Sequence, residues 1–69
     1  MMKFSIQLVR EDDGRWVAEL PELSGVMVYG STSESAVAKV KALALRLVAD
    51  RLERSEVGSD LAGVSFAAA

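Results

Sequence analysis

Apolar and polar residues alternate through the first 20 positions of the chain. Phe4, Ile6 and Leu8 are separated by Ser5 and Gln7, and this period of two is typical of a strand with one buried face. Residues 15–20 alternate again, with Trp16, Ala18 and Leu20 on one face and Val17 and Glu19 on the other. The pattern therefore predicts two consecutive strands, joined by a turn at residues 11–14, whose sequence is Glu-Asp-Asp-Gly.

The turn between these strands can be specified from their two apolar faces. The faces lie on the same side of the sheet only if the numbers of paired residues sum to an even value. A three-residue loop of Asp12, Asp13 and Gly14 satisfies this condition, and it pairs Arg10 with Trp16, Leu8 with Ala18 and Ile6 with Leu20. Such loops place a left-handed residue in a G1 bulge, a conformation that glycine adopts at little cost. We therefore predict this loop, because a two-residue loop would turn one apolar face to water.

Residues 21–30 predict the end of the second strand and a short third strand. Pro21 has no N–H to donate to the ladder, so it ends the second strand. Ser24 and Gly25 indicate a turn. The run from residue 26 to residue 29 predicts a strand antiparallel to the second one, and Gly30 closes it.

A long helix is predicted from about residue 33 to about residue 54, a segment free of Gly and Pro. Ser31 or Thr32 can cap it. Ser31 with Glu34 fits the capping box S-x-x-E, and we expect it to be the better cap because Ser35 weakens a box built on Thr32. Beyond the helix we expect a polar connection at 55–60 with Gly58 as a stop, a fourth strand at 61–66 and a frayed end at 67–69. The chain is then a single α+β domain, residues 1–69, with the element order β-β-β-α-β.

The helix carries two apolar seams. The first covers an arc of about 140° and is expected to lie on the sheet; it comprises Ala36, Val37, Val40, Leu43, Ala44, Leu47 and Val48. The second has heptad-like spacing and comprises Ala38, Ala42, Leu45, Ala49 and Leu52. One sheet face cannot bury both seams. Either the second seam is an ordinary exposed surface of good helix formers, or it packs against a helix of another copy in a homo-oligomer.

Length and composition sharpen this choice. A chain of 69 residues is marginally stable alone, and without Cys or His it has neither disulfides nor the two commonest zinc ligands. Its hydrophobic content of 51% favours a second buried surface. The net charge of −2 argues against a surface that binds nucleic-acid phosphates. The N-terminus is not a signal peptide, and no apolar run is long enough for a membrane span, so we expect a cytoplasmic protein that does not bind membranes.

Candidate chemistry is sparse. The available nucleophiles are Ser and Thr, without the His that usually activates them. Glu11, Asp12 and Asp13 share the hairpin loop, where they form a hard-cation site, an acidic docking surface or an ordinary solvated turn. Trp16 is either a core residue under the helix or an anchor for a partner. We therefore expect no enzyme, and no catalytic, cofactor-binding or metal-binding residues.

Two ordered motifs carry a family resemblance. The first is Gly14-x-Trp16-Val17-Ala18-Glu19-Leu20-Pro21-Glu22-Leu23-x-Gly25, and the second is Gly30-x-Thr32-x-Glu34-x-Ala36. Over about residues 3–66 the chain resembles the HicB-like antitoxins of type II toxin–antitoxin systems. Ser24 stands where that family usually has Pro, and Ser35 stands where it usually has Glu. The resemblance implies a partial ribonuclease H-like fold with sheet order 3-2-1-4, in which the fourth strand is parallel to the first.

The resemblance also implies a function. The chain is expected to bind and neutralise a HicA-like toxin, a small basic mRNA-cleaving ribonuclease, and an acidic protein suits a basic RNA-binding surface. Candidate contacts are Glu11, Asp12, Asp13, Glu19 and Glu22. Many relatives continue into a DNA-binding domain, and since this sequence stops at Ala69 we expect no direct DNA binding. The alternative is an orphan, stand-alone oligomeric domain with a structural or small-ligand-binding role.

Overall fold

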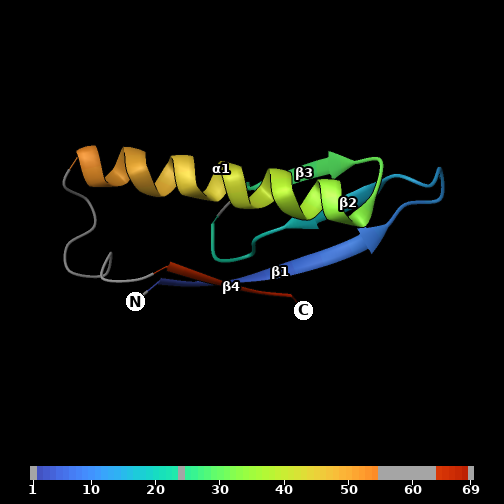
Figure 1. The fold of residues 1–69 in the computed structure, drawn as a ribbon, viewed down its shortest axis with the longest axis horizontal. Coiled ribbons are helices and arrows are strands. Elements are labelled where there is room, and N and C mark those ends of the chain that lie inside the picture. Colours follow the sequence, from blue (N-terminus) through green and yellow to red (C-terminus); the bar gives the residue numbers. More distant parts are fainter. Residues whose placement is uncertain (1, 24, 55–63, 69) are drawn as a thin grey trace.

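A computed structural model describes residues 2–23, 25–54 and 64–68 of the chain. Its elements are β1 (Met2–Arg10), β2 (Trp16–Glu19), β3 (Met27–Gly30), α1 (Ser33–Glu53) and β4 (Val64–Ala68). The four strands form one sheet in the order β3-β2-β1-β4, with β4 parallel to β1 and the other pairs antiparallel. Helix α1 lies along one face of this sheet (Figure 1). The predicted α+β class, the β-β-β-α-β order and the parallel fourth strand are confirmed.

The β1–β2 hairpin has the predicted loop. Its register pairs Arg10 with Trp16 and Leu8 with Ala18. The N–H of Glu11 donates to the Arg15 carbonyl at 2.7 Å, and the N–H of Gly14 donates to the Glu11 carbonyl at 2.9 Å. Gly14 has a φ of +89°, the left-handed conformation of a G1 bulge. The requirement that the two apolar faces lie on the same side of the sheet therefore predicts the loop length correctly.

The ends of β2 and β3 differ slightly from the predicted ones. Strand β2 ends at Glu19, and β3 runs from Met27 to Gly30 rather than from 26 to 29. Leu20 still donates its N–H to the Val26 carbonyl at 3.1 Å, but the regular pairing with β1 stops at Gln7 and Glu19, so the predicted pair of Ile6 with Leu20 lies outside it. The physical reason is Pro21, which cannot donate to β1.

The joint between β3 and α1 is tightly packed. A Cβ placed on Gly30 would lie 2.5 Å from the backbone nitrogen of Ala36, so only glycine lets the helix start this close to the strand. Thr32 is the N-cap, and its Oγ1 accepts the N–H of Ser35 at 3.0 Å. The expectation that Ser31 with Glu34 makes the better cap is wrong, because it is Thr32 whose backbone is extended at the helix start.

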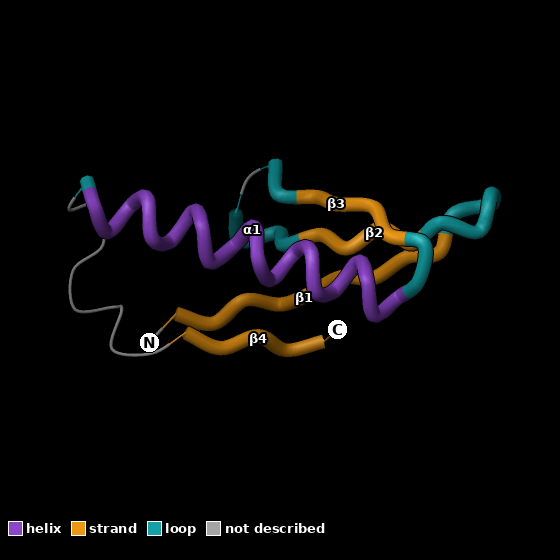
Figure 2. Tube along the Cα trace, turned by 45° about the horizontal axis from the view of Figure 1, so that its top comes forward, coloured by secondary structure: helices purple, strands orange, loops and turns teal. Residues whose placement is uncertain are grey.

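The core lies between α1 and the sheet (Figure 2). The helix packs mainly on β2 and β3 and less on β1. The fully buried or nearly buried members are Phe4, Ile6, Ala18, Leu20, Leu23, Val26, Ala36, Val40, Ala44 and Val48. Four of the helix residues of the first seam are thus buried, and Val37, Leu43 and Leu47 pack against them. The prediction that this seam faces the sheet is confirmed.

Strand β4 lies two to three residues later than predicted. It spans Val64–Ala68 rather than residues 61–66, and it pairs Phe66 with Phe4 and Ala68 with Ile6. The Phe4 and Phe66 rings stack with centroids 5.5 Å apart. Ala67 and Ala68 are therefore paired rather than frayed, because β1 supplies a long neighbouring strand. The polar connection with Gly58 lies outside the described residues, as do residues 61–63 and Ala69.

Candidate protein-binding surfaces

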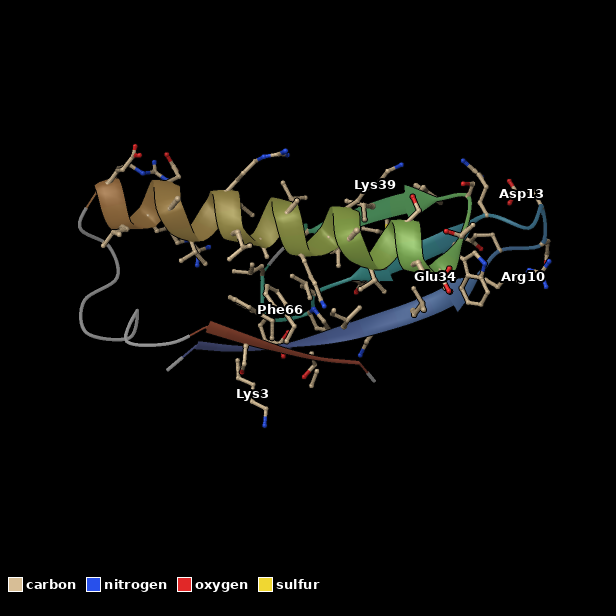
Figure 3. The ribbon with its side chains drawn as sticks, viewed as in Figure 1. Lys3, Arg10, Asp13, Glu34, Lys39 and Phe66 are labelled. Atoms are coloured by element: carbon tan, nitrogen blue, oxygen red, sulfur yellow. The ribbon has the colours of Figure 1, made fainter. Side chains whose placement is uncertain are left out.

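The structure separates the five candidate acidic contacts into two groups. Glu11, Asp12 and Asp13 lie in the hairpin loop, at one end of the molecule, and all three are exposed. Figure 3 shows Asp13 at this end, near Arg10. Glu19 lies at the other end of β2, about 13 Å along the strand from the Glu11–Arg15 pair at the usual rise per residue, and Glu22 lies beyond it. A single partner patch would have to span β2 to touch both groups.

Asp13 is engaged within the hairpin loop. Its carboxylate accepts the backbone N–H of Arg15 at 3.0 Å and the Arg15 Nε at 2.7 Å. The backbone N–H of Arg15 lowers the pKa of Asp13, and the Arg15 guanidinium lowers it further. Among the described residues, no hydrogen bond or ion pair engages the side chains of Glu11 and Asp12. Of the three loop carboxylates, these two are available to a partner.

Glu22 has a structural role that the sequence pattern does not predict. Its Oε2 accepts the backbone N–H of Ser5 at 3.0 Å. If the register between β1 and β2 continued, Ser5 would pair with Pro21. At this point β2 leaves the sheet, and the Glu22 carboxylate accepts the Ser5 N–H instead. The pKa of Glu22 is lowered, first by its own backbone N–H and then by that of Ser5. Glu22 therefore stabilises the sheet end, which leaves it less suited to a partner contact.

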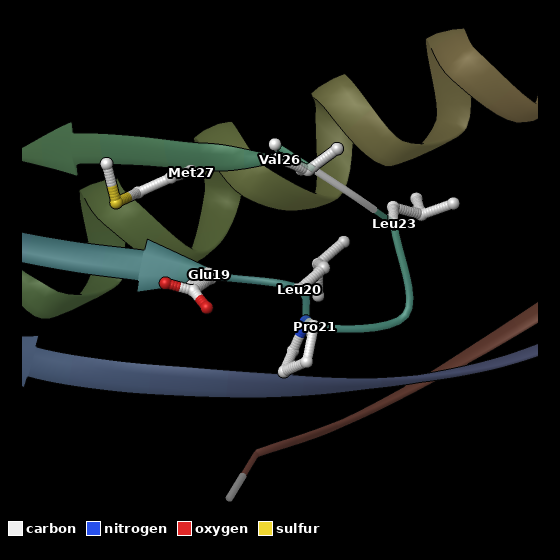
Figure 4. A pocket seen from close by; sticks show the side chains of 7 residues that line it. Glu19, Leu20, Pro21, Leu23, Val26 and Met27 are labelled. Carbon is white, nitrogen blue, oxygen red and sulfur yellow. The ribbon is translucent and has the colours of Figure 1, made fainter.

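Glu19 borders a shallow pocket of about 240 Å³. The other lining residues come from the β2–β3 connection and the start of β3: Leu20, Pro21, Leu23, Gly25, Val26 and Met27. Figure 4 shows the Glu19 carboxylate and the Met27 side chain on neighbouring strands at this pocket. Gly25 has a φ of +80°, which agrees with the turn predicted at this position; Ser24 lies outside the described residues. The pocket is apolar apart from one carboxylate.

No group of three or more acidic side chains within the described ranges is arranged to hold a metal ion. In the hairpin loop, Asp13 turns its carboxylate to Arg15, which competes with any cation for the same oxygens. The acidic loop therefore offers an electrostatic surface in preference to a hard-cation cage.

The sheet face away from α1 carries an apolar patch that the sequence reading missed. Val9 on β1 and Tyr29 on β3 flank Val17 in one cross-strand row. Val9 is 58% exposed, Tyr29 is 42% exposed and Met27, in the next row, is 49% exposed, whereas Val17 is buried between its neighbours. The signal was the continuous run Val26-Met27-Val28-Tyr29, in which both faces of a strand are apolar.

Trp16 belongs to the helix side of the sheet. It is half-buried and packs against the core, opposite Gly30 in the register. Of its two interpretations, the core residue fits this placement.

The second helix seam points away from the sheet. Leu45 is 51% exposed and Leu52 is 52% exposed, Ala38 and Ala49 are exposed, and Ala42 is half-buried. The prediction that the sheet cannot bury both seams is confirmed. Whether a second helix covers this seam stays a prediction.

Within the described residues, no helix is long and apolar enough to cross a membrane. The chain matches no protein-family model, no curated protein and no solved structure. Its function has to be inferred from its own residues and surfaces.

Proposed function

We propose that this chain is an antitoxin-like binding protein that neutralises a small, HicA-like, mRNA-cleaving ribonuclease and performs no catalysis of its own. The observation that carries the proposal is the role of the motif residues in the fold. Gly14 forms the hairpin bulge and Pro21 ends β2, while Thr32 caps α1 at the Gly30–Ala36 contact. The residues that resemble the HicB-like pattern are thus the residues that build this β-β-β-α-β scaffold.

Charge supports a basic partner. The chain has a net charge of −2, and an acidic surface attracts a basic ribonuclease and covers the groups with which it binds RNA. Glu11 and Asp12 are exposed at the hairpin end, and Glu19 is exposed beside the apolar patch. We place the toxin contact on these carboxylates in the cytoplasm, where the target RNA lies.

The proposal includes self-association through the second helix seam. Leu45 and Leu52 expose about half of their surface on one helix face, with small residues between them at heptad-like spacing. A second copy packing on this seam would bury both leucines and supplement a core that is small for a free domain.

Co-expression tests the antitoxin function. A reading frame adjacent to the gene that encodes a basic protein of about 60–80 residues, the size of a small single domain, would be expressed with and without a tagged copy of this chain. The proposal expects the neighbour to arrest growth alone, and to be relieved by and co-purify with this chain. Unrelieved toxicity without a complex would refute it.

Charge-reversal variants locate the contact. Asp12→Lys is expected to weaken the complex at least tenfold, with a greater loss at low salt. Glu53→Lys is the matched control, because it makes the same charge change at an exposed site at the opposite end of α1. Equal weakening by both variants would show a general charge effect rather than a contact at the hairpin.

A further inference from the structure

Strand β3 lies at an edge of the sheet. One hydrogen bond to the residue after β2 shows which residues of β3 turn their backbone groups toward β2 and which turn them outward. The Leu20 N–H donates to the Val26 carbonyl, so the even-numbered residues of β3 face β2 in the antiparallel alternation. The N–H and C=O groups of Met27 and Tyr29 consequently point away from β2, to the outer side of the sheet. Two residues of one strand thus present a complete set of outward donors and acceptors.

Apart from its short length of four residues, strand β3 carries little of the usual protection against strand pairing. Natural edge strands carry charged residues, prolines or bulges, whereas β3 reads Met-Val-Tyr-Gly. Lys39 is the exception, since its Nζ reaches from α1 to the Tyr29 carbonyl at 3.3 Å (Figure 3). A carbonyl oxygen accepts two hydrogen bonds, so Lys39 is compatible with a further donor from outside.

We propose that β3 pairs with β3 of a second copy of this chain, antiparallel, with Val28 opposite Val28 of the partner subunit. Around this two-fold axis Met27 lies opposite Tyr29 of the partner subunit, and the reverse pair is identical. Both pairs consist of outward-facing residues, so all their N–H and C=O groups can bond in register. A shift by one residue would place Val28, whose groups face β2, opposite an outward residue.

The side chains fit the same register. Met27 and Tyr29 are the two exposed large apolar residues of β3, and both lie on the sheet face away from α1. The two-fold axis brings each Met27 beside Tyr29 of the partner subunit, a sulfur–aromatic contact. The apolar row of Val9, Val17 and Tyr29 then continues across the interface instead of ending at solvent. β3 itself carries no charged side chain; the charges beside this edge are the Lys39 ammonium at the Tyr29 carbonyl and the Arg15 guanidinium, which lies over the Tyr29 ring at 4.5 Å.

This contact is separate from the second helix seam. On one flank of the seam, Lys39 of α1 reaches the β3 edge. On the other flank, Lys41 lies over the Phe66 ring of β4 at 5.8 Å. The seam itself faces neither sheet edge. Pairing through β3 yields one eight-stranded sheet from two four-stranded ones, with both helices on the same side.

Cysteine crosslinking tests the register directly, because the chain has no native Cys. Residues opposite each other in a non-hydrogen-bonded pair have Cα atoms about 4.5 Å apart, within the range of about 4.4–6.8 Å that a disulfide spans. With copper–phenanthroline and dioxygen as oxidant, Val28→Cys is expected to form a disulfide-linked dimer at more than about half yield. Cysteine is a small apolar residue and suits the half-buried position.

Two matched variants control this test. Val9→Cys places a more exposed thiol on β1, and Met27→Cys places one beside the two-fold axis but off it; both are expected to stay monomeric on denaturing gels. Crosslinking of Met27→Cys in place of Val28→Cys would overturn the register. No crosslinking of Val28→Cys above the Val9→Cys level would overturn the contact, whatever mass the helix seam gives the wild type.

A proline variant tests the contact without a covalent bond. Met27→Pro removes one outward N–H and leaves the bonds between β3 and β2 in place, so the circular dichroism spectrum is expected to be retained. Light scattering should show at least a tenfold weaker association. Val9→Lys, on the open face but away from the edge, is expected to associate like the wild type. If Val9→Lys dissociates the assembly and Met27→Pro does not, the face rather than the edge is the interface.

Discussion

The C-terminal end of β3 and its outer edge make opposite kinds of contact. At its C-terminal end Gly30 meets Ala36 so closely that a Cβ would lie 2.5 Å from a backbone nitrogen, and Thr32 satisfies an N–H of the first helical turn. Along its outer edge, Met27 and Tyr29 turn their backbone groups and much of their side chains away from the chain. The first region is complete within one copy, and the second is the edge that we propose to pair with a second copy.

This difference explains why family-like residues and working residues need not coincide. The residues at the joint are restricted to one or two amino-acid types by backbone contact and capping, and they leave a pattern that can be read along the chain. The contacts that we propose with a ribonuclease would restrict only exposed positions such as Glu11 and Asp12 on the hairpin. A motif can therefore identify a scaffold while the surface that binds a partner lies elsewhere.

The largest predicted effect is at the joint. Gly30→Ala adds one carbon against the Ala36 backbone, which cannot move without shifting α1, and we expect a loss of about 3 kcal/mol in unfolding free energy. Gly14→Ala adds the same carbon where nothing lies within 4 Å and is expected to lose about 1–2 kcal/mol from left-handed strain alone. Urea denaturation measures both. An equal or smaller loss for Gly30→Ala would contradict the close joint.

Next in size is the effect on association through the second helix seam. Leu45→Glu combined with Leu52→Glu places two charges on this seam without touching the core, so the mass measured by light scattering should fall while the helix content is kept. Arg46→Glu, at an exposed position of α1 outside the seam, is the control. If the double leucine variant keeps the wild-type mass, the seam is an ordinary exposed surface.

A smaller effect is expected at the helix cap. Thr32→Ala removes the acceptor of the Ser35 N–H, which costs about 1 kcal/mol of unfolding free energy for a typical N-cap. Ser31→Ala, one residue earlier, should change stability by less than about 0.5 kcal/mol, as at most surface sites. Thermal or urea unfolding distinguishes the two, and a larger loss for Ser31→Ala would restore the capping box built on Ser31 and Glu34.

The smallest effect concerns pH. Glu22 has its pKa lowered below the usual 4.5 in the folded chain, so its ionised form is stabilised by folding. This contribution is fully present above the pKa of the unfolded chain and is lost as the pH falls through the lower, folded value. The urea midpoint of Glu22→Gln should therefore lie below that of the wild type at pH 7 and converge with it in acid. A constant gap between Glu22→Gln and the wild type across this pH range would argue against the bond to Ser5.

Particular residues show how far sequence reasoning reaches. The hairpin loop was predictable, because two apolar faces and one Gly after two Asp allow only one register. The cap was not, because Ser31 and Thr32 have equal capping chemistry and only the chain direction at Gly30 decides between them. The bounds of β4 were missed because Ala67 and Ala68 carry no periodic signal, and their pairing depends on the length of β1.

The candidate surfaces were predictable to a different degree. Helical periodicity alone separates the second seam from the buried one, and the exposure of Leu45 and Leu52 agrees with it. The acidic contacts were grouped by composition, but the structure divides them, because Glu22 binds the Ser5 N–H and Asp13 binds Arg15. Such local partners depend on where β2 leaves the sheet, and no spacing in the sequence encodes that point.

Inhibition of RNA cleavage tests the central claim most directly. The purified neighbouring ribonuclease would be incubated with a labelled mRNA and increasing amounts of this chain, with Asp12→Lys and Glu53→Lys titrated in parallel. Cleavage is expected to fall linearly and to stop near one chain per ribonuclease, with only Asp12→Lys shifted to higher concentration. Undiminished cleavage at a tenfold excess of the wild-type chain would contradict the antitoxin function.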